Sequence, residues 1–169
     1  MHWNEKIDLL KKEFSDEDFS VPHVDRKRIL RKIESQFISR PEYYYDLNNS
    51  NPGFSHWWDH IKYPVEMTIN LNWQSFLTSA IDLEDQSWIA CEFPDRIMIY
   101  KARLNAILYL ISTGQTWTQN FHVIQLKYQF LLSVRIDKVE FKIKASGDEE
   151  FEERLKRATT SASPNRADR

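Results

Sequence analysis

The sequence predicts an α+β protein with a mainly antiparallel sheet of about five to six strands, helices packed on one face and two helices at the N-terminal end. Strand patterns follow one another between Trp88 and Ile143, separated by short turns and one amphipathic helical pattern. Two further helical patterns precede them. At 169 residues with 41% hydrophobic residues, the chain has the size of one domain.

The N-terminal part of the chain predicts two amphipathic helices and a loop. Apolar residues recur at helical spacing over residues 3–14. A second apolar stripe runs from Ile29 to Phe37, so we expect a helix with Asp25 as N-cap that ends before Pro41. Residues 41–53 are rich in Asn, Ser and Pro and predict a loop. A short helix is expected over residues 56–61.

The central part of the chain predicts strands, two helices and a hairpin. Residues 65–72 alternate between apolar and polar side chains, as a half-buried strand does. A helix is expected over residues 73–81. Residues 88–93 and 96–100 are dense in β-favouring side chains around a Pro-Asp turn, which indicates a hairpin. A helix is expected at 102–112.

The C-terminal part predicts three more strands and a charged helix. The strand patterns cover residues 121–126, 130–137 and 139–144, and the last two form a hairpin that turns near Asp137. Residues 148–158 predict a helix that closes a single domain over residues 1–158. Residues 159–169 have nothing to bury and are expected to be disordered.

Composition argues against several classes of function. The lone Cys91 has no disulfide partner, and no segment has the length and apolar character of a signal core or membrane span. We therefore expect a cytoplasmic protein. A net charge of −2 argues against binding to nucleic acid or an anionic membrane. With three glycines, no phosphate-binding loop or dinucleotide motif is present, and no cofactor is expected.

Histidines supply the candidates for chemistry. His56 and His60 are four residues apart in a predicted helix and could share a metal, although a zinc enzyme needs a third ligand. The enzymatic alternative is a small metal-dependent hydrolase that uses this pair. The structural alternative is that both histidines are polar helix residues beside buried tryptophans and bind no metal. His122 lies in a strand pattern, where it could act as a base or be held by hydrogen bonds.

Aromatic and acidic residues supply the candidates for binding. Aromatic residues make up 14% of the chain, and Trp and Tyr are favoured at protein interfaces. Acidic residues can steer a basic partner to its site. The predicted contact residues with a partner protein are Trp57, Trp58, Asp82, Glu84 and Asp85.

Three segments carry a resemblance to a known group of proteins. They run from Gly53 to Pro64, from Asp95 to Tyr100 and from Phe121 to Leu132. Their order resembles that of small bacterial domains broadly similar to the SUKH-type immunity proteins of toxin systems. The resemblance implies a non-enzymatic protein that binds and neutralises a partner toxin, such as a basic nuclease. A structural subunit of a larger assembly is a third possibility.

Overall fold

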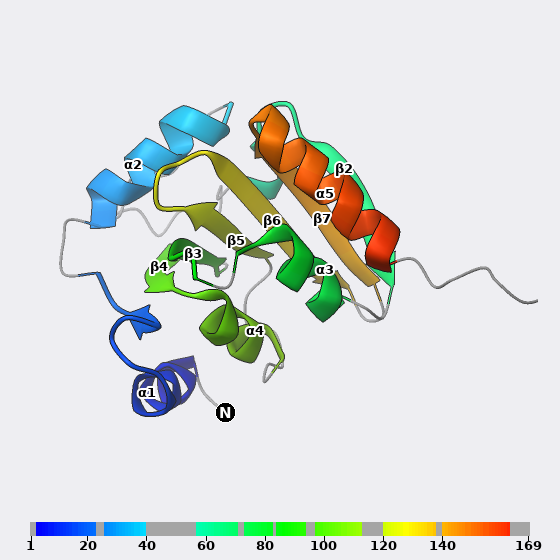
Figure 1. Ribbon diagram of the computed structural model, residues 1–169. Helices are drawn as coiled ribbons and strands as arrows, with labels where there is room; N and C mark the ends of the chain where they lie inside the picture. Colours follow the sequence, from blue (N-terminus) through cyan, green and yellow to red (C-terminus); the bar gives the residue numbers. More distant parts are fainter. Residues whose placement is uncertain are drawn as a thin grey trace, which may run out of the picture.

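The computed structural model describes residues 3–22, 26–39, 57–70, 73–82, 84–93, 97–112, 120–137 and 140–162. In these ranges seven strands form one sheet in the order β1-β4-β3-β5-β6-β7-β2, with every neighbouring pair antiparallel (Figure 1). The strands are β1 (Phe19–Ser20), β2 (Val65–Asn70), β3 (Ser87–Glu92), β4 (Ile97–Ala102), β5 (Asn120–Gln125), β6 (Phe130–Asp137) and β7 (Glu140–Gly147). The predicted α+β class is therefore confirmed.

Helices alternate with these strands as the apolar periodicity predicts. The helices are α1 (Trp3–Glu13), α2 (Arg26–Phe37), the 3-10 helix η2 (Trp57–His60), α3 (Trp73–Ala80), α4 (Leu104–Ser112) and α5 (Glu149–Ala162). Each α-helix buries the side of its surface that carries the apolar residues. The predicted N-cap Asp25 and the predicted loop over residues 41–53 lie outside the described residues.

The larger hydrophobic core lies between one face of the sheet and α1, α3, α4 and α5. Figure 1 shows α5 lying along β7 and β2. Alternate strand residues supply the floor of this core, including Ile89, Val123, Leu132 and Ile143, which the pairing register places in neighbouring strands. We refer to this side as the first face of the sheet.

The opposite, second face carries a smaller core beneath α2. Ala90, Ile99, Ile124 and Leu131 point to this side and pack with Ile33 of α2. The expectation that the helices pack on one face is therefore wrong for α2. The reason lies in Ala90 of β3, Ile124 of β5 and Leu131 of β6, which are apolar and buried on the second face, so that these strands need cover on both faces.

Two other details differ from the sequence-based prediction. The sheet has one or two more strands than expected, because the two-residue β1 is too short to carry an alternating pattern. Helix α5 extends to Ala162, so the prediction that disorder begins at Thr159 is wrong for Thr159–Ala162. The remainder of the predicted tail, residues 163–169, lies outside the described residues.

Candidate protein-binding site

The two edges of the sheet differ in how well they are protected. At one edge, β1 offers only two residues, and short edge strands are a common defence against unwanted pairing. At the other edge, β2 has six residues and pairs with β7 alone among the described strands. Neither proline nor lysine interrupts Val65–Asn70. Every second residue of β2 therefore presents backbone N–H and C=O groups that no described strand uses.

Exposed apolar side chains gather at the start of this edge strand. In the described part of the chain, the large hydrophobic side chains that are exposed are Tyr63, at 92%, and Val65, at 40%. Tyr63 has a backbone φ of 47°, in the left-handed region that bulky residues rarely occupy. Such strain is often found at functional sites, and an exposed tyrosine is a frequent energetic anchor of protein interfaces.

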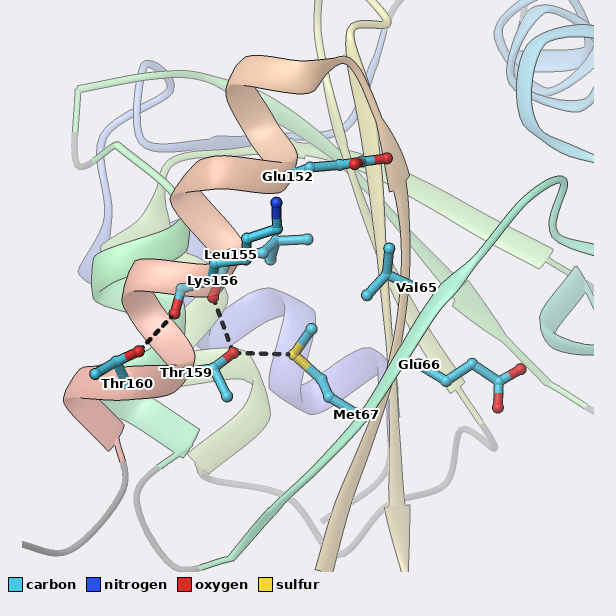
Figure 2. Close-up of a pocket in the computed structure, with 8 residues that line it drawn as sticks. All are labelled: Val65, Glu66, Met67, Glu152, Leu155, Lys156, Thr159 and Thr160. Atoms are coloured by element: carbon cyan, nitrogen blue, oxygen red, sulfur yellow. Dashed lines mark hydrogen bonds between the residues drawn. The ribbon is translucent and has the colours of Figure 1, made fainter.

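A groove of about 570 Å³ separates the edge strand from helix α5 (Figure 2). Val65 and Met67 line it from β2, and Glu152, Leu155 and Thr159 line it from α5. Figure 2 shows Glu152 and Leu155 projecting from the helix towards β2, while Glu66 points away from the groove. The volume is in the range of protein sites that bind small molecules or side chains.

The local sequence explains why α5 forms one wall of this groove. The Asp148 carboxylate accepts a hydrogen bond from the Phe151 backbone N–H at 2.9 Å, which caps the helix N-terminus. Phe151, Leu155 and Ala158 are spaced by four and three residues and are all buried against the sheet. At the far end the Thr159 hydroxyl lies 3.5 Å from the Met67 sulfur, so helix and edge strand touch there.

The charges around the groove are unevenly paired. Lys156 donates a hydrogen bond to Glu153 at 2.6 Å, which lowers the pKa of Glu153 and raises that of Lys156. Glu66 pairs with Lys144 at 3.0 Å. Glu152 is half-buried in the groove wall and makes no ion pair with any residue that the structure describes. Glu152 interacts with Lys156 only through longer-range electrostatics, so a half-buried carboxylate without an ion pair to a described residue lies beside an apolar groove.

The predicted aromatic contact residues occupy the second face of the sheet. Trp57 is fully buried, with its backbone N–H 2.6 Å from the Glu92 carboxylate and its indole N–H 3.1 Å from that of Glu34. Trp58 is 6% exposed and lies below two cations, with Arg135 4.6 Å and Lys144 5.3 Å from its ring centre. The structure gives both tryptophans a role in the fold, and neither of them is exposed.

The predicted acidic contact residues lie at the other end of β3. Asp82 and Glu84 are exposed, whereas Asp85 is half-buried and accepts a hydrogen bond from Gln125 at 3.4 Å. Trp57 contacts Glu92, the last residue of β3, so the two groups are roughly 20 Å apart along the strand. The hollow beside Glu84 and Asp85 is also lined by the cations Lys101, Arg103 and Lys127. The structure therefore does not bring the five predicted contact residues together.

Within the described residues, the structure shows no set of metal ligands around His60. His60 lies in the 3-10 helix η2, and its backbone carbonyl accepts hydrogen bonds from the backbone N–H and the hydroxyl of Ser39. His56 lies outside the described residues. Within the described ranges, no group of three or more His, Cys, Asp and Glu side chains could hold a metal ion.

A buried polar network surrounds His122 on the second face. Its Nδ1 lies 2.5 Å from the Ser133 hydroxyl, and its Nε2 lies 3.2 Å from a Glu92 oxygen without the alignment of a hydrogen bond. The Asn120 amide donates to the other Glu92 oxygen, and Arg135 donates to Asn120 at 2.9 Å. Ser, His and Glu form a catalytic set in some hydrolases, but here all three are fully buried. In this structure the network joins β3, β5 and β6 to η2.

Comparisons with protein-family models, curated proteins and solved structures found no match. The similarity to SUKH-type immunity proteins therefore stays a prediction. None of the helices that the described residues form has both the length and the apolar composition of a membrane span.

The groove is the feature that sequence reasoning missed. Its two walls come from Val65 and Leu155, which are 90 positions apart, and only tertiary pairing places them side by side. The available signal was the uninterrupted alternation of residues 65–70, which lacks the prolines and lysines that protect edge strands. This alternation indicates a binding edge only once β2 is known to lie at the edge of the sheet.

Proposed function

We propose that this protein is a non-enzymatic protein-binding module, an immunity-type antagonist that binds and neutralises a partner toxin at the open edge of β2. The observation that carries the proposal is the exposure of Tyr63 and Val65 at the start of an edge strand that no described strand covers. Soluble proteins usually protect such edges, so an open one with apolar side chains is a natural site for a partner.

The mode of binding would be the addition of a strand. In that mode an extended segment pairs with an exposed sheet edge, its backbone supplies affinity, and pockets for alternate side chains supply specificity. Strand β2 supplies the backbone groups, and the groove beside α5 supplies a pocket on the first face of the sheet. A cytoplasmic location is part of this proposal, and the single buried Cys91 is compatible with it.

Two substitutions at exposed positions test the proposal without disturbing the core. Tyr63→Ala removes the exposed tyrosine, and Val65→Lys places a charge at the mouth of the groove. Thr78→Lys on the exposed side of α3 is the matched control. Each protein is tagged and expressed in its native cells, and the proteins it retains are quantified. We expect a stoichiometric partner that the wild type and Thr78→Lys retain and that Tyr63→Ala and Val65→Lys lose.

The antagonist role needs a second readout. The retained partner, expressed alone, should arrest growth, and the wild type but not Val65→Lys should restore growth. A partner that is retained equally by Tyr63→Ala and Val65→Lys would refute the edge as the binding site. A partner that does not arrest growth would refute the antagonist role.

A further inference from the structure

We infer that the β2 edge and its groove bind an extended segment with apolar residues at alternate positions and a lysine or arginine that reaches Glu152. This inference rests on the proposed function and deepens it by naming the chemistry of the bound segment.

The pleat of the sheet dictates the alternation. Successive side chains of a strand point to opposite faces, and a strand added beside β2 lies about 4.8 Å from it. Val65, Met67 and Ile69 point to the first face, towards α5. Side chains of the added strand on this face would meet the apolar surface of Val65 and Leu155. Those on the second face would lie beside Glu66 and Thr68, which are exposed.

The charge of the bound segment follows from Glu152. Its carboxylate is half-buried and has no ion pair with a described residue, whereas the neighbouring Glu153 and Glu150 pair with Lys156 and Arg154. The cation among the residues that line the groove, Lys156, donates a hydrogen bond to Glu153 at 2.6 Å. A basic side chain in the bound segment would complete the pairing, while an acidic one would meet a like charge.

The same charge pattern favours a different protein over a second copy of this chain. Helix α5 begins with Glu149, Glu150 and Glu152, and Asp148 precedes it. Pairing two β2 edges would bring two copies of this acidic segment to one interface, where like charges oppose association. A basic segment from a partner supplies a cation that can form an ion pair with Glu152.

A selection with displayed peptides tests the inference. The probe is a phage library of random peptides of about twelve residues, long enough to pair with all of β2. The wild-type protein should enrich peptides with alternating apolar residues and a Lys or Arg. Synthetic peptides from this set should bind Glu152→Gln about three- to ten-fold more weakly than the wild type. Glu149→Gln, which removes the same charge from an exposed position on the same helix, should leave affinity unchanged.

The outcomes separate the inference from the proposed function. Peptides that bind through the edge, and so lose affinity for Val65→Lys, but lack a basic preference would refute the inference alone. Peptides that bind Val65→Lys as tightly as the wild type would refute the edge as a binding site. An absence of enriched peptides would refute both. Sedimentation measures whether the wild-type protein dimerises. A dimer that is lost in Val65→Lys would show that a second copy occupies the groove, and it would also overturn the inference.

Discussion

Glu92 is the residue on which the second face of the sheet depends most. Its fully buried carboxylate contacts the Trp57 backbone N–H, the Asn120 amide and the His122 ring. A buried polar group is tolerated only where such partners replace water. Because these partners come from η2 and β5, Glu92 fixes how the 3-10 helix sits on the sheet.

Replacement of Glu92 by alanine should therefore destabilise the protein strongly. Glu92→Ala leaves a buried backbone N–H and a buried amide without their acceptor, and we expect the free energy of unfolding to fall by about 3 kcal/mol. Urea denaturation followed by tryptophan fluorescence measures it. The control, Glu66→Ala, alters a largely exposed carboxylate and should cost less than about 1 kcal/mol. Equal stabilities of the two variants would contradict the structural role of the network.

Cys91 should make stability depend on pH in the alkaline range. Burial raises the pKa of its thiol well above the ordinary range, and the nearby Lys6 ammonium only partly opposes this. Above about pH 8.5 the unfolded chain loses a thiol proton that the native state keeps. The native state then binds more protons, so the free energy of unfolding falls as the pH rises.

The Cys91→Ala variant isolates this effect. The loss of stability between about pH 7 and about pH 10 should be smaller in Cys91→Ala than in the wild type. Burial also lowers the pKa of Lys6, which acts in the opposite direction, but both proteins carry that lysine. Urea denaturation across the pH range measures the difference. Parallel curves would show that the Cys91 thiol ionises alike in the native and unfolded states.

The network around His122 illustrates what sequence cannot predict at the residue scale. Strand patterns identify His122 and Ser133 as polar positions in apolar strands, but their contact depends on the register that places them opposite each other. Glu92 joins them only because β3 pairs with β5. Local pattern therefore predicts that these residues need partners, and the strand pairing decides which partners they obtain.

At the scale of elements, the junction between β7 and α5 is closely packed. Phe130 and Phe151 stack with ring centres 4.1 Å apart, and Gly147 passes beside both rings. A Cβ atom on Gly147 would lie 2.5 Å from a Phe151 ring carbon and 2.9 Å from the Phe130 Cβ. The glycine therefore lets the strand end close enough to the helix for the two rings to stack.

Gly147→Ala should force this junction apart. Overpacking of this kind costs about 1–3 kcal/mol, so we expect a lower midpoint of thermal unfolding. Ser146→Ala, one residue earlier and half-exposed, is the control and should change the midpoint little. Because α5 forms one wall of the groove, Gly147→Ala should also weaken peptide binding. A variant as stable as the wild type would show that the aromatic rings move aside without cost.

Helices and strands were largely predictable, whereas their positions in the sheet were not. The alternation in β2 and the apolar spacing in α1 predicted the right elements, because these patterns are local. Nothing local indicates that β2 pairs with β7 at the edge, since the two strands are about 75 residues apart in sequence. The two-residue β1 gave no pattern at all.

At the scale of the whole molecule, the two faces of the sheet have different roles. Four helices cover the first face, and one of them, α5, forms a wall of the groove, while α2 and η2 cover the second face above the polar network. The sequence predicted a binding site from aromatic and acidic composition, but the structure buries Trp57 and places Glu84 and Asp85 in a separate hollow that cations also line. Composition cannot predict which side chains remain exposed after folding, and that exposure decides which surface a partner can reach.

The most direct test of strand addition at β2 is a scan of N-methylated peptides. One peptide selected on the wild-type protein is synthesised with a single N-methyl group at each backbone position in turn, and its affinity is measured by fluorescence anisotropy. If the peptide pairs with β2, methylation should weaken binding at least about tenfold at alternate positions, whose N–H groups face the strand, and little at the positions between them. Losses without this two-residue period, or no loss at any position, would contradict binding at the edge of the sheet.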